Sequence, residues 1–208
     1  MPLPCPAVVP LLDALVAFDE HEAVRLLDEH RERAGLTSLV GDLVLPVMKQ
    51  VGQGWERGAV TVAQEHLATQ LVRAYLDSLR RPPVHAGPQV WLACPPRELH
   101  DLPLLALGLL LWDQGWQVRF FGANTPLHDL LRSTRVSTPR VVVISADDPE
   151  RLRASAVALD LIAAESTLLL GGRAAELVGE SLAGRVLPPD VVAAAELLRE
   201  ELLEAPVA

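Results

Sequence analysis

The sequence predicts an α + α/β chain, in which a four-helix bundle is followed by a doubly wound parallel sheet of five strands. Two patterns predict this order. Apolar residues recur at helical spacing up to about residue 81, and short apolar runs alternate with helical segments from residue 89 onward. Residues 82–88 are rich in proline and separate the two patterns. We therefore expect a bundle over residues 1–81, a linker over residues 82–88 and an α/β domain over residues 89–208.

The first half contains four helical segments, at about residues 8–18, 19–35, 38–55 and 61–80. Asp19 places an acid at the start of the second segment, and Gly35 is expected to end it. Pro46 lies inside the third segment and is expected to kink or break it. Thr61 is suited to cap the fourth segment. The inward face of that segment is expected to consist of leucines: Leu67, Leu71 and Leu79.

The second half alternates between the two kinds of element. We expect strands near residues 89–94, 117–121, 140–145, 167–170 and 185–187, and helices near residues 99–114, 126–136, 149–164, 173–180 and 190–203. Five such units predict a doubly wound sheet of the flavodoxin-like, or Rossmann-type, class. In that class the first and third strands flank the point at which ligands bind, beyond the carboxyl ends of the strands.

Composition excludes several classes of protein. The formal charge of −9 and the scattered Lys and Arg residues argue against direct contact with nucleic acid. The longest apolar run is too short to span a membrane, and the N-terminus lacks the pattern of a secretory signal. Cys5 and Cys94 are too few for a disulfide framework. We therefore expect a cytoplasmic protein without a membrane or nucleic-acid partner.

Residues able to bind a ligand stand at the ends of three predicted strands. His100 follows the first strand and has Glu98 and Asp101 beside it, Ser145 ends the third strand, and a Gly-Gly pair at residues 171–172 ends the fourth. A histidine can bind a metal through one ring nitrogen while a carboxylate orients the other. Each feature alone is ordinary in a loop or turn. Together they predict a deep slot in which glycines let a flat group approach the backbone.

The bundle contains a second candidate group. Trp55 lies near the end of the third helical segment, and Glu65 and His66 lie early in the fourth. These side chains are expected to meet at one end of the bundle, although a core tryptophan and a solvated Glu-His pair are an equal alternative. Nucleophile, phosphate-loop and zinc motifs are absent from the sequence, so no catalytic residues are assigned.

The combined pattern resembles a known family. Trp55, nine further residues, Glu65-His66, a linker and then Glu98-x-His100 resemble the cobalamin-binding sensor module of MerR-type light-responsive repressors of carotenoid genes. The sheet half also resembles the cobalamin-binding domain of methionine synthase and corrinoid methyltransferases. That wider family carries Asp-x-His-x-x-Gly, Ser-x-Leu and Gly-Gly at similar spacing. The similarity covers roughly residues 8–200.

The resemblance implies a function and a role for each residue. His100 is expected to be the lower axial ligand of cobalt, with Glu98 and Asp101 beside it and the nucleotide tail entering beside Ser145, Gly171 and Gly172. Trp55, Glu65 and His66 are expected to cap the upper face, over the adenosyl group of adenosylcobalamin. In such sensors light breaks the cobalt–carbon bond and changes assembly. The implied protein is a light-responsive regulator, not an enzyme, that forms a homo-oligomer or binds a transcription regulator protein.

Several positions depart from the family pattern. Pro103 replaces the glycine after His100, Asp147 replaces an apolar residue after Ser145, and Glu56 stands where some light sensors have a histidine. The sequence begins without the DNA-binding domain of those repressors, so regulation is expected to require a partner.

Two alternatives remain. One is a corrinoid protein that carries a methyl group, as methylcobalamin, for a methyltransferase system. The other is a degenerate interaction module that has lost cobalamin. The tryptophan favours the sensor, because a methyl carrier has no need of a tryptophan over an adenosyl group.

Overall fold

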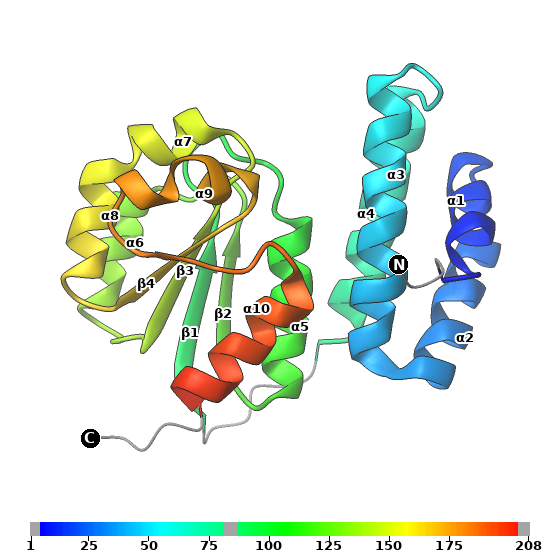
Figure 1. Ribbon diagram of the computed structural model, residues 1–208. Helices are drawn as coiled ribbons and strands as arrows, with labels where there is room; N and C mark the ends of the chain where they lie inside the picture. The colour runs from blue at the N-terminus through cyan, green and yellow to red at the C-terminus, as the bar shows by residue number, and fades with distance from the viewer. Residues whose placement is uncertain (1–4, 81–86, 204–208) are drawn as a thin grey trace. The chain divides into compact units, whose positions relative to one another are not determined.

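A computed structural model describes residues 5–80 and 87–203 of the chain (Figure 1). Backbone contacts divide the chain into two compact units, residues 1–80 and residues 81–208. The predicted linker at residues 82–88 lies mostly outside the described residues.

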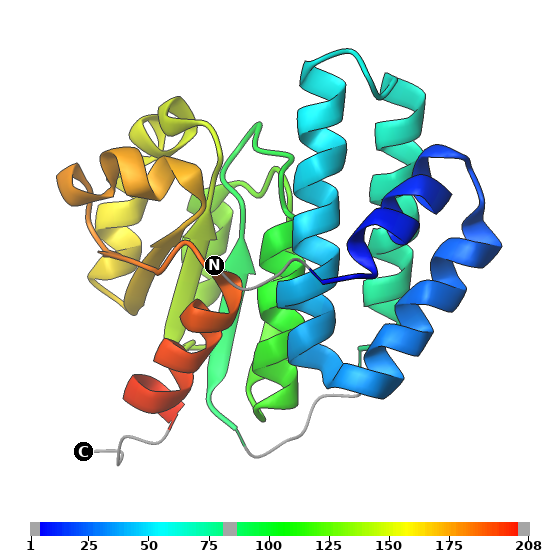
Figure 2. The same cartoon turned by 45° about the vertical axis from the view of Figure 1, so that its right-hand side comes forward.

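The first unit, here called the helical unit, contains four α-helices and one π-helical segment (Figure 2). They are α1 (Val8–Val16), α2 (Glu20–Ser38), the π-helical segment (Leu39–Val44), α3 (Leu45–Glu56) and α4 (Val62–Ser78). Helix α1 packs against α2, α3 and α4. Aliphatic side chains fill the core between the helices, among them Leu11, Leu15, Leu27, Leu43, Val47, Val51, Val72 and Leu76. The predicted helical bundle is therefore confirmed.

Local sequence explains where these helices begin and change course. The Asp19 side chain caps α2 by accepting a hydrogen bond from the N–H of Glu22 at 3.0 Å. Gly35 adopts φ +81° and interrupts α2, a conformation that residues with a Cβ rarely adopt. Pro46 lies in the first turn of α3, directly after the π-helical segment. The wider π turn accommodates the missing N–H and the ring of proline, so the expected break takes this form.

Helix α4 begins with a reciprocal cap and buries a different face from the one expected. The Thr61 hydroxyl accepts from the N–H of Gln64, and the Gln64 side chain accepts from the N–H of Thr61. The predicted inward leucines Leu67, Leu71 and Leu79 are only half-buried, so this prediction was wrong. The buried side chains of α4 are Ala68, Val72, Tyr75 and Leu76. Tyr75 belongs to this face because its hydroxyl reaches the Asp28 carboxylate at 2.8 Å.

The second unit, here called the sheet unit, contains five parallel strands in the order β2-β1-β3-β4-β5. They are β1 (Gln89–Ala93), β2 (Gln117–Gly122), β3 (Val141–Ser145), β4 (Thr167–Gly171) and β5 (Arg185–Val186). The helices are α5 (Leu102–Asp113), α6 (Leu127–Thr134), α7 (Pro149–Ala154), α8 (Ala156–Ala163), α9 (Arg173–Val178) and α10 (Val191–Leu198). The doubly wound, flavodoxin-like order is therefore confirmed.

Helices cover both faces of the sheet (Figure 1). Helices α5 and α10 pack together on one face, and helices α6, α7, α8 and α9 cover the other. Strand β3 and most of β1 are buried on both faces. Such strands read as continuous apolar runs, which is why their positions could be predicted from the sequence.

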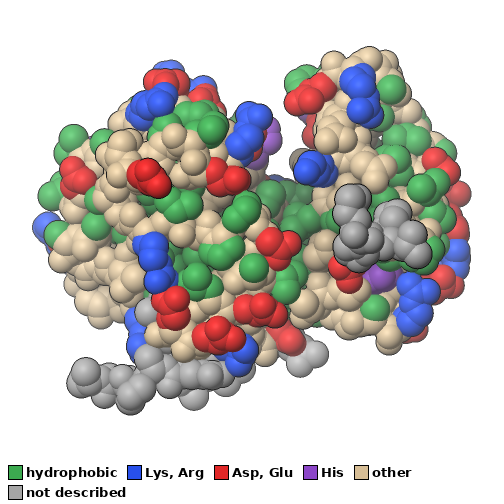
Figure 3. Space-filling view, in the orientation of Figure 1, with side chains coloured by type: hydrophobic (Ala, Val, Ile, Leu, Met, Phe, Trp, Pro, Cys, Tyr) green, Lys and Arg blue, Asp and Glu red, His purple; other side chains and the backbone are tan. Residues whose placement is uncertain are grey.

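The surface carries charges of both signs. On the face drawn in Figure 3, Lys and Arg side chains are interspersed with Asp and Glu and form no continuous basic patch. Within residues 5–80 and 87–203, no helix has the length and apolar character needed to cross a membrane.

Candidate functional site

The loop between β1 and α5 carries His100 and is held by the loop that follows β2. The N–H of Arg97 donates to Oδ1 of Asn124 at 2.8 Å, and the N–H of Asn124 donates to the carbonyl of Glu98 at 2.9 Å. Arg97 and Asn124 both adopt positive φ, at 66° and 53°. Backbone strain of this kind persists only where surrounding bonds support it. The two loops therefore form one braced structure at the carboxyl edge of the sheet.

Glu98 is the centre of this structure. Only 2% of the residue is exposed, and its carboxylate accepts hydrogen bonds from three backbone N–H groups: His100 at 2.9 Å, Asp147 at 2.8 Å and Asp148 at 3.2 Å. Burial alone would raise the pKa of Glu98. The backbone donors and the His100 side chain outweigh burial and lower the pKa to about 2. Glu98 is therefore a buried anion at neutral pH.

The His100 ring is oriented by that anion. Nδ1 of His100 lies 2.7 Å from Oε1 of Glu98. Because the ionised carboxylate can only accept, Nδ1 carries the hydrogen and Nε2 carries the lone pair. The side chain is 73% exposed, so Nε2 is accessible from outside the loop. This arrangement of carboxylate, histidine and open nitrogen is typical of a histidine that ligates a metal.

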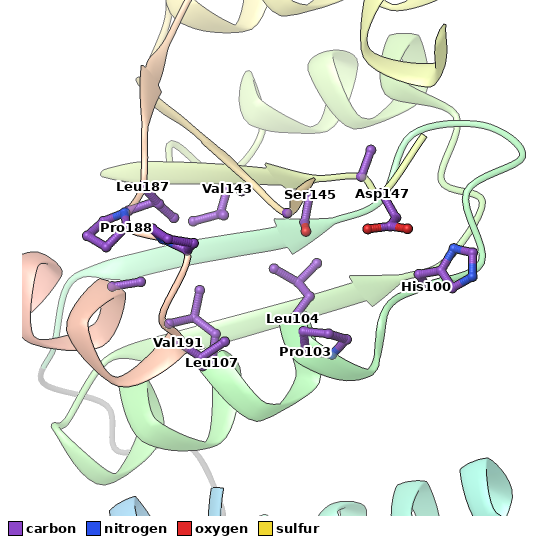
Figure 4. A pocket seen from close by; sticks show the side chains of 15 residues that line it. His100, Pro103, Leu104, Leu107, Val143, Ser145, Asp147, Leu187, Pro188 and Val191 are labelled. Carbon is purple, nitrogen blue, oxygen red and sulfur yellow. The ribbon is translucent and has the colours of Figure 1, made fainter. Parts of the chain in front are cut away.

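A pocket of about 100 Å³ lies beside His100 (Figure 4). His100 and Asp147 stand at one end of the pocket, and Leu187, Pro188 and Val191 stand at the other. Helices α5 and α10 supply part of its apolar wall, through Leu104, Leu107, Val191 and Ala194. Ser145, Gly171 and Gly172 also line it. The structure thus brings together the predicted residues from three strand ends.

Ser145 supplies a polar group inside the pocket. The residue is 7% exposed, and its hydroxyl makes no hydrogen bond to the described part of the chain. The hydroxyl is therefore available to a ligand.

The two glycines serve different purposes. Gly172 adopts φ +80°, and a Cβ there would lie 2.3 Å from the carbonyl oxygen of Ala146. Gly172 is therefore required by its own backbone contact rather than by a ligand. A Cβ at Gly171 would make an ordinary contact, 3.6 Å from Oγ of Ser145, and would take up space in the pocket.

The remaining predicted residues of this loop have defined contacts. Asp101 is buried and accepts a hydrogen bond from the N–H of Ala123 at 3.0 Å, so it braces the two loops. Asp147 lines the pocket and pairs with Arg173 at 3.3 Å. Pro103 lies in the first turn of α5, where its missing N–H removes no helical hydrogen bond. The structure therefore accommodates two of the departures from the family pattern, Pro103 and Asp147.

In the helical unit, Trp55 lies at the end of α3, and Glu65 and His66 lie near the start of α4, on either side of the turn that joins the two helices. The N–H groups of Ala59 and Val60 both donate to the carbonyl of Gly54, which folds this turn tightly. Trp55 is 50% exposed. Nδ1 of His66 lies 2.6 Å from the Glu65 carboxylate, and the His66 side chain is exposed. The predicted alternative of a core tryptophan is wrong, because half of Trp55 faces outward.

Sequence reasoning missed the residues that brace the site. Asn124 and the backbone N–H groups of Asp147 and Asp148 were not predicted to hold the His100 loop. The only available signal for Asn124 was its type, since asparagine tolerates positive φ better than most residues. Within the described residues, His, Cys, Asp and Glu form no cluster of three or more that could hold a metal ion. Any metal bound here would need most of its ligands from a cofactor.

Comparison with known proteins also indicates a cofactor that contains a metal. Residues 10–80 match the family model of the B12 binding domain. This match covers nearly all of the helical unit. The chain is 36% identical over 140 residues to the HTH-type transcriptional repressor CarH of Myxococcus xanthus, covering 65% of this chain and 46% of the repressor. It is 34% identical over 133 residues to the repressor CarA of the same organism, covering 62% and 44% of the two chains.

The resemblance to cobalamin-binding modules of this repressor family is therefore confirmed. The chain spans about half the length of these curated relatives.

Solved structures show the same fold. The monomethylamine corrinoid protein of Methanosarcina barkeri superposes with a TM-score of 0.73 at 16% identity, covering 91% of this chain and 95% of that protein. A cobalamin-binding protein of Desulfitobacterium hafniense DCB-2 superposes with a TM-score of 0.51 at 17% identity, covering 93% and 97%. At these identities the likeness establishes the fold and nothing further.

Proposed function

We propose that this protein binds cobalamin through His100 and acts as an adenosylcobalamin-dependent sensor, not as an enzyme. The observation that carries the proposal is the Glu98–His100 pair, which leaves Nε2 of His100 as an accessible lone pair at the edge of a pocket. A corrin carries most of the ligands of its own cobalt, so a single protein ligand, His100, would be enough to hold the metal.

The residues present fit such a group. Glu98 fixes the tautomer of His100, and three backbone N–H groups fix Glu98 in turn. Buried partners of this kind make a histidine a better ligand than a freely rotating side chain. The chemistry that the cofactor supplies when bound is a cobalt–carbon bond that light can break.

We assign the nucleotide tail of the cofactor to the pocket beside Ser145, Gly171 and Gly172. Its volume of about 100 Å³ is smaller than the roughly 300 to 1,000 Å³ of typical ligand sites. We therefore expect the pocket to widen on binding. Ser145 offers its hydroxyl to the tail, and Gly171 keeps that part of the slot free of a side chain.

We assign Trp55, Glu65 and His66 to the upper axial ligand. Trp55 presents an exposed aromatic face, which suits contact with the adenine or ribose of an adenosyl group. Glu65 and His66 present a hydrogen-bonded polar pair near the start of the following helix, α4. A methyl group, as in methylcobalamin, would offer these three side chains neither an aromatic ring nor a hydrogen-bonding group.

The signal is proposed to be a change in assembly. Loss of the upper ligand removes contacts with Trp55, Glu65 and His66, and a ligand shifts a conformational equilibrium only through such differential contacts. The partner is then a second copy of this chain or a transcription regulator protein. The acidic charge makes direct DNA contact by these 208 residues unfavourable.

The test combines an absorption spectrum with size-exclusion chromatography. The protein is mixed with adenosylcobalamin in darkness, desalted, and measured before and after green illumination. We expect retained cobalamin, a spectral change on illumination and a shift in elution volume. Retained cobalamin without a shift in assembly would favour the methyl-carrier function. No retained cobalamin would contradict the proposal and favour an interaction module that has lost the cofactor.

A further inference from the structure

The pocket beside His100 is polar at one end and apolar at the other (Figure 4). His100 and Asp147 stand at the polar end. The opposite end, here called the far end, is formed by Leu107, Leu187, Pro188 and Val191. Every side chain of the far end consists of carbon and hydrogen alone, so none of them can donate or accept a hydrogen bond.

The backbone of the far end is also poor in hydrogen-bond donors. Pro188 and Pro189 both line the pocket, and proline has no N–H. The N–H of Leu187 donates to the carbonyl of Leu170 at 2.8 Å, so this donor is already used within the protein. Three consecutive residues of the wall therefore bring no free donor to a ligand.

Ser145 is the polar side chain that lies between the two ends of the pocket (Figure 4). Its hydroxyl can pair with one nitrogen of an aromatic base. Benzimidazole and adenine both contain an imidazole ring, so both can offer such a nitrogen to Ser145. Ser145 therefore holds a base without distinguishing between these two kinds, and any distinction is made by the far end.

The direction of the nucleotide tail follows from the proposed function, on which this inference rests. Where Nε2 of His100 binds cobalt, the corrin ring lies at the polar end of the pocket. The tail then enters at that end, and the base, which is its last group, reaches toward the far end. The far end is thus the part of the pocket that contacts the six-membered ring of the base.

We propose that the pocket selects corrinoids by their lower base and favours dimethylbenzimidazole, the base of cobalamin, over adenine. The six-membered ring of dimethylbenzimidazole carries only carbon and hydrogen, and its burial among aliphatic side chains is favourable. The six-membered ring of adenine contains two nitrogens and carries an amino group. At the far end these groups lose water and find no side chain as a hydrogen-bond partner, which makes their burial unfavourable.

This selection gives the sensor a narrower ligand than the corrin ring alone would define. The contacts of His100 with cobalt, and those of Trp55 with the upper ligand, are the same for every adenosylated corrinoid. The far end reads the only part of the molecule that differs between cobalamin and its adenine analogue.

The test compares three corrinoids that share the adenosyl upper ligand and differ in the tail. They are adenosylcobalamin, the adenosylated corrinoid with adenine as its lower base, and adenosylcobinamide, which has no nucleotide. Dissociation constants are measured on the full chain by equilibrium dialysis in darkness. Val191→Thr adds a hydroxyl to the far end with little change in shape. Val192→Thr is the matched control, because Val192 is the next residue of α10 and does not line the pocket.

We expect adenosylcobalamin to bind at least about tenfold more tightly than the adenine analogue, since a buried hydrogen-bonding group without a partner carries a penalty of this size. Val191→Thr is expected to reduce this preference severalfold, because its hydroxyl gives adenine a partner. Val192→Thr should keep the wild-type preference. Should Val191→Thr unfold, the comparison of the three corrinoids in wild type decides the matter.

Two results would overturn the inference and leave the proposed function in place. One is equal affinity for adenosylcobalamin and its adenine analogue, with both above adenosylcobinamide, because the tail would then occupy a pocket that does not discriminate. The other is equal affinity for adenosylcobalamin and adenosylcobinamide, because the tail would then lie outside the pocket. Failure to bind any of the three corrinoids would instead contradict the proposed function itself, and the inference with it.

Discussion

Oε2 of Glu98 accepts a hydrogen bond from the backbone N–H of Asp147 at 2.8 Å, and this bond joins the loop after β1 to the loop after β3. The same carboxylate orients His100 through its other oxygen. The histidine and the mouth of the pocket are therefore positioned by one buried side chain. Glu98 acts as a positioning residue whose loss disturbs both features at once.

Replacing Glu98 by glutamine tests this role. A glutamine has one acceptor oxygen, so it leaves at least one buried backbone N–H without a partner. We expect the free energy of unfolding in urea to fall by about 1–3 kcal/mol. Cobalamin affinity, measured by absorption titration, is expected to fall about 10- to 100-fold. Glu176→Gln, an exposed change on α9, is the control. Wild-type affinity in Glu98→Gln would show that the carboxylate does not orient the ligand.

Stability should depend on the ionisation of Glu98 in acid. The pKa of Glu98 is lowered in the folded protein from its ordinary 4.5 to about 2. The unfolded chain therefore binds the extra proton first, and the contribution is full above about pH 4.5 and disappears as the pH falls toward about 2. We expect the difference in unfolding free energy between wild type and Glu98→Gln to shrink from near pH 6 to near pH 3. If the difference in unfolding free energy between the two proteins stays constant across this pH range, the lowered pKa assigned to Glu98 is refuted.

The two glycines after β4 should respond differently to alanine. Gly172→Ala forces a side chain into a positive-φ conformation and against the Ala146 carbonyl, so we expect a loss of at least about 3 kcal/mol in unfolding free energy. Gly171→Ala meets only ordinary contacts and should change stability by about 1 kcal/mol or less. Because its methyl group enters the pocket, Gly171→Ala should nevertheless weaken cobalamin retention on a desalting column. Equal stability of the two variants would contradict the conclusion that the backbone requires glycine at residue 172 but not at residue 171.

Trp55 should matter for the upper ligand and not for folding. Its side chain is half exposed, so Trp55→Ala should change the unfolding free energy by about 0.5 kcal/mol or less. Adenosylcobalamin should bind about tenfold more weakly, a loss of about 1.4 kcal/mol, whereas methylcobalamin binding should be unchanged. Val9→Ala, another exposed apolar residue of the helical unit, is the control. Equal loss for the two cobalamins would remove the assignment of Trp55 to the adenosyl group.

Sequence patterns predicted the framework because the framework depends on local composition. The buried strands β1 and β3 are continuous apolar runs, and their order placed His100 and Ser145 at one edge of the sheet. The bracing of His100 was not predictable in the same way. Two of the partners of Glu98 are backbone N–H groups about fifty residues away in the chain, and a backbone group carries no sequence signal.

Sequence patterns also failed to predict some contacts in the helical unit. Leucine spacing in α4 pointed to Leu67, Leu71 and Leu79, but the buried face follows Tyr75, whose hydroxyl has a partner on α2. Tertiary contacts of this kind override the leucine pattern. The Cys5–His30 contact likewise joins residues 25 positions apart and is visible only in the folded unit.

The most direct test of the account is the identity of the lower axial ligand. Protein labelled with nitrogen-15 in its histidines is loaded with cobalamin, reduced to the cobalt(II) form, and measured by electron paramagnetic resonance. A ligating histidine nitrogen couples to the unpaired electron, so the account predicts that labelling changes the nitrogen splitting in wild type. In His100→Ala the labelled and unlabelled spectra should be identical. If the nitrogen splitting of the wild-type protein is the same with and without the label, cobalt is not bound by histidine. That result would contradict the assignment of His100.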